Sequence, residues 1–287
     1  MKSKLKEIIN LLAGKEMAML PSGLAFSLFL SIIPVLSIIF FIVTSLHLSM
    51  EYITEFINKT FNPGVATLMQ PVITSGINLS SLITIIFGLI IATNGCYSII
   101  SASNTIFKIE SSNYIKRFGK ALIMMVIMLV LLMFLLIVPL LGESILKLLN
   151  HFGNFIKNNE ALVGVLYIIL RVPISLVVIF VLVKLLYKIA PDQKIKSAYV
   201  NKGAAFTTIS WLIVTMFFSY YINNIARYDL IYGNLANIVI LMLWIYFLAY
   251  IFVIGLVLNK NQTDAKIDET NTIKLSEIRK KIKDKEK

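Results

Sequence analysis

The chain has 287 residues and a formal net charge of +12; 58% of its residues are hydrophobic and only 15% are charged. Its mean hydropathy is +0.84. A soluble core cannot bury that much apolar surface, so the composition excludes an ordinary soluble domain and predicts an all-α protein that crosses a membrane several times. Cys96 is the only cysteine, which excludes an intrachain disulfide and a cysteine-based metal site.

The first predicted element is an amphipathic helix within residues 1–20, lying in the cytoplasmic interface of the membrane. Apolar side chains recur there at intervals of three and four residues, on one face of a helix: Leu5, Ile8, Ile9 and Leu12. Lysines occupy other positions, which is typical of a helix that lies on a membrane rather than crossing it. We expect Pro21 to redirect the chain into the membrane.

Six apolar windows follow, and together they predict a six-transmembrane helical bundle over residues 21–259. A membrane helix needs about 20 mostly apolar residues. The windows that meet this length are 24–46, 81–101, 119–141, 161–187, 203–222 and 235–258. Residues 260–287 form a charged tail, either solvated and partly helical or attracted to anionic lipid headgroups.

The charge of the connecting segments alternates along the chain. The N-terminal piece, 102–120, 184–202 and the tail each carry a net positive charge, whereas the three segments between them are neutral or negative. Cytoplasmic loops of membrane proteins are enriched in Lys and Arg. We therefore expect a membrane protein with both termini in the cytoplasm. The basic residues are spread over short segments rather than one motif, so a nucleic-acid partner is not expected.

Polar residues in the first two spans are candidates for a binding cleft. Ser31 and Pro34 share one face of the first span, and Pro34 predicts a kink because it removes a backbone donor. Asn94 and Ser98 form a polar stripe in the second span. These side chains either make interhelical hydrogen bonds or line a substrate cavity.

Arg171 is the strongest single signal for function. It lies in the apolar run YIILRVPISLVV, two residues before Pro173, where a second kink is expected. An arginine at mid-membrane costs about 2.5–3.5 kcal/mol on insertion scales and usually marks a buried partner or a wet path. Either Arg171 reaches the outer boundary or pairs with Glu143 or Glu160, or it is an uncompensated cation that meets an anionic ligand.

Signals for catalysis are absent from the sequence. The two histidines lack ligand-like neighbours, and no phosphate-binding loop, nucleotide fingerprint or metal-binding His-Glu cluster occurs. No pair of carboxylates within a span suits acid–base work. We therefore expect no catalytic residues, no metal, no cofactor and no enzymatic activity.

Three segments resemble the YihY/BrkB family of bacterial inner-membrane proteins, also described as UPF0761 membrane proteins. They are LAFSLFLSIIP, LLYKIAPDQKIKSAYVNKGAAF and IYGNLANIVILMLWIYFLAYIFVIGLVLN. The matched landmarks are Ala25, Phe26, Ser31, Pro34, Tyr187, Pro191, Gly203, Ala204, Tyr232, Gly233, Trp244, Gly255 and Asn259. Phe26 stands where the family often has Tyr, and Val257 where it commonly has Glu.

The resemblance implies a six-span bundle, and it leaves function open. Family members have been linked to serum resistance and given a ribonuclease label, which the lack of an acidic metal cage in this sequence does not support. Our leading hypothesis is a protein that transports or binds an anionic or amphipathic molecule or lipid, through Arg171, Asn94, Ser31 and Ser98. A non-transporting scaffold for the cell envelope is the second hypothesis, and a membrane enzyme the third. The expected partners are membrane lipids.

Overall fold

The computed structural model describes residues 14–45, 79–151, 160–224, 228 and 232–285. Within these residues the chain is all-helical, with two short 3-10 turns, η1 (Ser197–Val200) and η2 (Gly233–Leu235). Its six long helices are α2 (Lys15–Ser45), α5 (Leu79–Phe107), α6 (Tyr114–His151), α8 (Glu160–Ile189), α9 (Asn201–Asn224) and α11 (Ala236–Lys285).

Each of the six predicted spans falls on one of these helices. Among the described residues, four helical stretches are long and apolar enough to cross a membrane: Met17–Ile39, Ile86–Phe107, Ser197–Ile222 and Ala236–Asp264. The predicted spans 119–141 and 161–187 lie in α6 and α8. Both helices include residues whose side chains fall outside the described part, so the count of six stays a prediction.

Two boundaries differ from the sequence analysis. Helix α2 runs through Pro21 without interruption, because this proline removes only the hydrogen bond to the Met17 carbonyl from a helix whose later turns are packed. Helix α11 continues from the last predicted span into the charged tail as far as Lys285. The predicted interfacial helix falls largely in residues 1–13, outside the described part of the chain.

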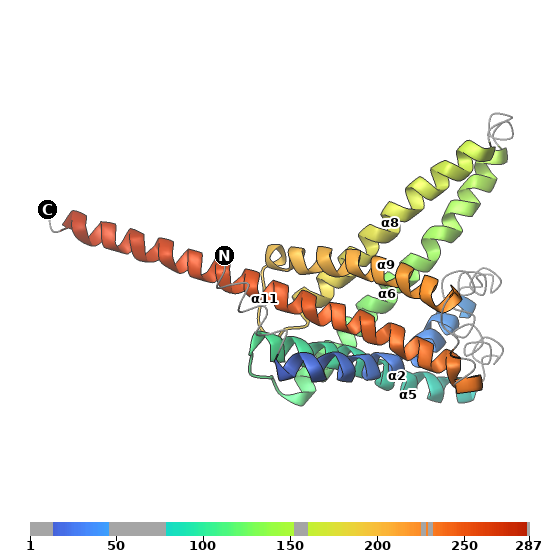
Figure 1. Cartoon of the computed structure of the whole chain (residues 1–287), viewed down its shortest axis with the longest axis horizontal. Helices are drawn as coiled ribbons and strands as arrows, with labels where there is room; N and C mark the ends of the chain where they lie inside the picture. The colour runs from blue at the N-terminus through green and yellow to red at the C-terminus, as the bar shows by residue number, and fades with distance from the viewer. Residues whose placement is uncertain (1–13, 46–78, 152–159, 225–227, 229–231, 286–287) are drawn as a thin grey trace.

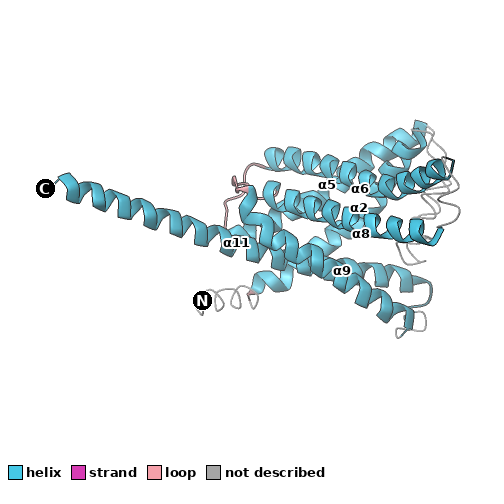
Figure 2. Ribbon diagram, turned by 90° about the horizontal axis from the view of Figure 1, so that it is seen from above, coloured by secondary structure: helices cyan, strands magenta, loops and turns pink. Residues whose placement is uncertain are grey.

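The helices pack in an order that closes a ring. Each helix contacts the next in the chain, α2 with α5, α5 with α6, α6 with α8, α8 with α9 and α9 with α11, and α11 returns to contact α2. Figure 1 shows α6 and α8 leaving the other helices together toward their far ends, and α11 projecting beyond the bundle at the opposite end. Figure 2 shows the same projection of α11 from above. The short connections α5–α6 and α8–α9 lie at this second end.

Small residues let the helices approach closely. Gly88 of α5 packs against Pro34 of α2, and a Cβ added at Gly95 would lie only 2.7 Å from the Ser31 hydroxyl. Without a hydrophobic force between helices in lipid, such close approach supplies much of the packing energy.

The tightest contact joins α8, α9 and α11. The fully buried Tyr187 hydroxyl lies 2.6 Å from Thr207 Oγ1 and donates to the Phe252 carbonyl at 2.8 Å. A Cβ at Gly255 would collide with both the Tyr187 hydroxyl and Thr207 Oγ1. Glycine at 255 is therefore required for the three helices to meet.

Replacing Gly255 with alanine tests this contact. We expect Gly255→Ala to lower the free energy of unfolding by about 1–3 kcal/mol, because overpacking forces side chains or backbone apart. The measurement is the thermal unfolding midpoint of the detergent-solubilised chain. Gly23→Ala is the matched control, since no atom lies within 4 Å of its added Cβ. Equal midpoints for the two variants would contradict the role given to Gly255.

Candidate functional site

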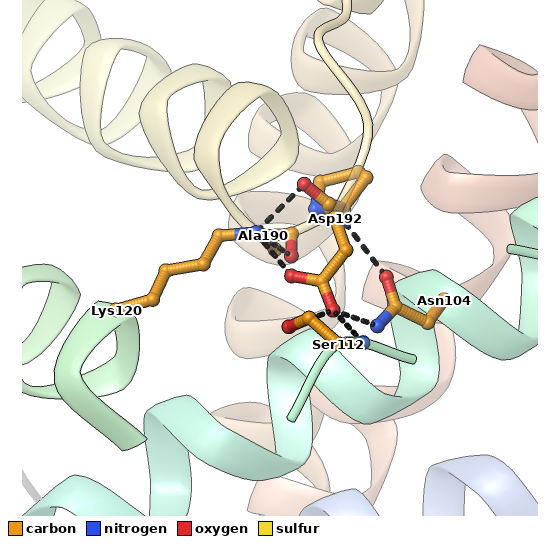
Figure 3. A network of polar contacts seen from close by, with 6 residues as sticks. Asn104, Ser112, Lys120, Ala190 and Asp192 are labelled. Carbon is orange, nitrogen blue, oxygen red and sulfur yellow. Dashed lines mark hydrogen bonds and ion pairs between the residues drawn. The ribbon is translucent and has the colours of Figure 1, made fainter. Parts of the chain in front are cut away.

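A polar network gathers at the end of the bundle where the α5–α6 and α8–α9 connections meet. Its centre is Asp192, three residues after the end of α8, with a side chain only 8% exposed. Figure 3 shows Asn104, Ser112 and Lys120 directed toward this carboxylate from other segments of the chain. We call these residues, with Ala190 and Pro191, the Asp192 network.

Both carboxylate oxygens of Asp192 accept hydrogen bonds. Its Oδ2 accepts from Asn104 Nδ2 at 2.8 Å, from the Ser112 amide at 3.0 Å and from the Ser112 hydroxyl at 2.9 Å. The Asn104 amide oxygen in turn accepts from the Asp192 backbone N–H at 2.9 Å. Asn104 is buried near the end of α5, so this pair of bonds joins α5 to the α8–α9 connection.

Lys120 of α6 completes the network from the other side. Its ammonium donates to the carbonyls of Ala190 and Pro191 at 2.8 and 2.7 Å and to Asp192 Oδ1 at 2.9 Å. These bonds use all three donors of the ammonium. Lys120 thereby caps the backbone after α8 and neutralises the buried carboxylate.

The network keeps Asp192 ionised. Burial alone would raise the pKa of this carboxyl, but Lys120, Ser112 and Asn104 together outweigh it and hold the pKa well below its usual range. A strongly hydrogen-bonded carboxylate with so low a pKa is a poor general base at neutral pH. The Asp192 network therefore holds the ends of α5, α6 and α8 together, and its carboxylate is not suited to act as a general base.

The serines of the predicted cleft meet in the contact between α2 and α5. The buried Ser31 hydroxyl donates to the Ser27 carbonyl at 2.7 Å and lies 3.2 Å from the Ile91 carbonyl of α5. The Ser98 hydroxyl donates to Ser27 Oγ at 2.7 Å. Asn94 is exposed on α5, so the structure does not bring it together with Ser31.

The residues of the predicted cationic site lie inside α8. Arg171 and Pro173 are both within this continuous helix, and Pro173 is exposed. The Arg171 side chain falls outside the described part of the structure. Pro34 likewise lies inside a continuous helix, where it packs against Gly88. The kinks expected at the two prolines stay predictions.

Most landmarks of the family resemblance serve packing. Besides Tyr187 and Gly255, the Gly203 amide donates to the buried Asn259 side chain at 2.8 Å, and a Cβ at Gly203 would collide with Asn259. Trp244 Nε1 donates to Thr215 Oγ1 at 3.2 Å, also between α11 and α9. Three further landmarks lie in the connections: Pro191 in the Asp192 network, and Tyr232 and Gly233 at the turn before α11, where Gly233 has a positive φ of 52°.

The Asp192 network was not predicted from the sequence, although one signal for it was present. Asp192 is the only acidic residue in the basic segment 184–202. A lone carboxylate among lysines next to a proline could have been recognised as a buried acceptor. Its partners Asn104, Ser112 and Lys120 lie more than seventy positions away in the sequence, and no local pattern links them to it.

Helical spans packed in a closed order, with a hydrogen-bonded network fastening the loops at one end, define a polytopic α-helical membrane protein. Over residues 11–275 the sequence matches the model of the family described as Virulence factor BrkB, and the chain belongs to this family. The resemblance seen in the three sequence segments is thus confirmed.

Individual relatives agree with this assignment. The chain is 26% identical to the ribonuclease-like protein YfkH of Bacillus subtilis over 88% of its own length and 92% of that protein. It is 24% identical to a UPF0761 membrane protein of Prosthecochloris aestuarii over 81% of its length and 54% of that protein. A UPF0761 membrane protein of Idiomarina loihiensis is 32% identical over 33% of this chain and 34% of its own. No solved structure matches the chain.

Breaking the Asp192 network should destabilise the bundle. We expect Asp192→Asn to lower the free energy of unfolding by about 3 kcal/mol, because it leaves the Lys120 ammonium without its counter-charge. Adding Lys120→Met should recover part of the loss. The unfolding midpoint in detergent measures both effects, with the exposed Glu110→Gln as control. A midpoint for Asp192→Asn equal to that of the control would contradict the assignment.

The same network predicts a pH dependence. Because the pKa of folded Asp192 is depressed, its stabilising contribution is present in full above about pH 5 and is lost as the pH falls from the unfolded pKa of about 3.9 to the lower folded pKa. We expect the stability difference between wild type and Asp192→Asn to be constant from about pH 5 to pH 8 and to shrink only in more acidic solution. Unfolding midpoints measured across this range check it, and a difference that already fades near neutral pH would refute it.

Proposed function

We propose that this BrkB-family membrane protein binds an anionic or amphipathic small molecule or lipid and moves it through the bilayer of the bacterial inner membrane. The observation that carries the proposal is the place of Arg171 inside α8. This helix is continuous from Glu160 to Ile189, so Arg171 lies on a membrane-length helix and not in a loop.

The length of α8 supports a membrane position for this arginine. At 1.5 Å per residue, Arg171 is about 16 Å along the axis from Glu160 and about 27 Å from the loop end at Ile189. Glu160 is therefore several turns away on the same helix. Since the hydrocarbon core is about 30 Å thick, a cation about 27 Å from the loop end lies toward the opposite side of the core, where it is still costly and is generally kept near a partner or water. We propose that the partner is the anionic group of the ligand.

The orientation of the protein forms part of the proposal. The basic connections α5–α6 and α8–α9 lie at one end of the bundle, where α11 also leaves it (Figure 1). By the excess of Lys and Arg, this end faces the cytoplasm. Both termini are then cytoplasmic.

A flux assay tests the role of Arg171. The probe is fluorescently labelled phosphatidylglycerol in vesicles that contain the purified full chain, and the readout is the rate at which label becomes accessible to an added quencher. We expect Arg171→Gln to reduce the rate about tenfold or more, since a hydrogen bond to a charged group contributes about 1.5–3 kcal/mol. The exposed Lys202→Gln, which removes a charge at the loop end, should leave the rate unchanged.

Two results would overturn the proposal. If the wild-type protein neither binds the probe nor accelerates its movement, transport is contradicted. Equal rates for Arg171→Gln and wild type would remove Arg171 from it. Unfolding midpoints of both variants ensure that a lost rate does not reflect a lost fold.

A second candidate is a non-transporting scaffold of the cell envelope. It is favoured by the use of Ser31 and Ser98 in helix packing, by the exposed position of Asn94, and by the projection of α11 past the bundle. Deleting residues 265–287 separates the two candidates. A deletion that abolishes the envelope phenotype of a knockout-complementation strain, together with an Arg171→Gln variant that preserves it, would select the scaffold.

We further propose that the chain is not an enzyme. The ribonuclease-like name belongs to the Bacillus subtilis relative. Within the described residues no group of three His, Cys, Asp or Glu side chains could hold a metal ion. The buried carboxylate of Asp192 is committed to its hydrogen bonds.

A further inference from the structure

The start of α6 carries a surface of rings and positive charges that neither the Asp192 network nor Arg171 accounts for. The Arg117 guanidinium lies 5.1 Å above the centre of the Tyr97 ring of α5. The Tyr97 and Tyr114 rings are 5.7 Å apart, and Tyr114 stacks on Phe118 at 6.1 Å. We call Tyr97, Tyr114, Ile115, Lys116, Arg117 and Phe118 the α6 surface.

Arg117 is held in place without a counter-ion. Its Nε is buried and has no hydrogen-bond partner, and among the described residues no carboxylate lies within ion-pair distance of it. Lys120, less than one turn further along α6, gives all three of its donors to the Asp192 network. The two cations therefore differ: Lys120 makes all of its hydrogen bonds within the protein, whereas Arg117 can bind an external anion.

Three residues that precede Arg117 are exposed, and they are aromatic, apolar and basic in turn. Tyr114 is 62% exposed and Ile115 is 83% exposed. Lys116 is exposed next to them. An exposed isoleucine is unfavourable in water, and two adjacent cations are unfavourable in hydrocarbon. The combination is typical of a segment at the boundary between water and the membrane.

The position of this surface along the predicted spans agrees with that boundary. Tyr97 lies near the end of the predicted span 81–101, and Arg117 lies two residues before the predicted span 119–141. Aromatic side chains gather at the level of the lipid headgroups, where their rings contact acyl chains and their polar ends contact water.

We propose that the α6 surface binds the phosphate of an anionic phospholipid of the surrounding bilayer. A guanidinium presents paired donors that match phosphate oxygens, and the Tyr97 ring beneath it fixes its plane. Lys116 adds a second positive charge, and Tyr114 and Ile115 contact the glycerol backbone and upper acyl chain. The charge of the surface selects an anionic lipid over a zwitterionic one. Such a lipid would be held whether or not anything crosses the bundle, so the inference goes beyond the proposed function.

Lipid retention by the purified full chain tests the inference. The probes are phosphatidylglycerol and phosphatidylcholine with identical acyl chains, added to the detergent-solubilised protein, and native mass spectrometry counts the bound lipids. We expect preferential retention of phosphatidylglycerol by wild type. Arg117→Gln should weaken its affinity about fivefold, because one basic side chain near an anionic surface contributes about 1 kcal/mol.

The controls separate this surface from general charge and from loss of fold. Lys194→Gln removes an exposed positive charge from the α8–α9 connection and should retain phosphatidylglycerol as wild type does. Without added lipid, Arg117→Gln should unfold close to the wild-type temperature, because it removes only the contact with the Tyr97 ring, which contributes about 0.5–1 kcal/mol.

Three outcomes would overturn the inference: equal retention of the two lipids by wild type, equal affinity of Arg117→Gln and wild type for phosphatidylglycerol, or stabilisation by inorganic phosphate as strong as that by the lipid. The proposed function is judged separately. Arg171→Gln should lose flux but keep the lipid on the α6 surface. Lost retention with normal wild-type flux would count against the α6 surface alone.

Discussion

The buried carboxylate of Asp192 is the constraint on which the loop end of this protein depends. An ionised group with so little exposure to water must have its charge and its lone pairs satisfied by the protein. Here α5, the α5–α6 connection and α6 each supply part of that requirement, through Asn104, Ser112 and Lys120. Because the acceptor belongs to the α8–α9 connection, the network joins this connection to α5 and α6, beside buried apolar residues such as Ile106, Ala190 and Ile195.

Within the bundle, the helices are joined by close packing at glycine residues. Glycines 95, 203 and 255 each face a polar side chain of a neighbouring helix, respectively Ser31, Asn259 and Tyr187. In hydrocarbon, where backbone and hydroxyl groups have no water to bond, close approach and a small number of satisfied polar contacts replace the hydrophobic effect as the source of specificity. Ser31, Thr207 and Asn259 are accordingly placed at helix contacts, whereas Asn94 and Ser219 are exposed.

Much of this architecture follows from the sequence because hydrophobicity and charge along a membrane chain are constrained locally. Windows of about 20 apolar residues fell on the observed helices, and the resemblance around Tyr187, Gly203 and Gly255 identified the family correctly. The continuation of α2 through Pro21 was not predicted, because the tolerance of a helix for proline depends on packing elsewhere along it. The partners of Asp192 were not predicted either, since three segments far apart in the chain supply them. For Ser31 and Ser98 the sequence allowed two roles, and only the three-dimensional neighbours distinguish a packing serine from a cavity serine.

One consequence arises from the unbroken course of α11. The same helix that carries Gly255 and Asn259 into the tightest contacts of the bundle leaves it and runs on to Lys285, about 30 Å beyond Ala265. Because α11 has no break between Gly255 and Lys285, the direction of the tail is set by the same helix that makes the contacts with Tyr187 and Gly203, and no separate linker lies between them.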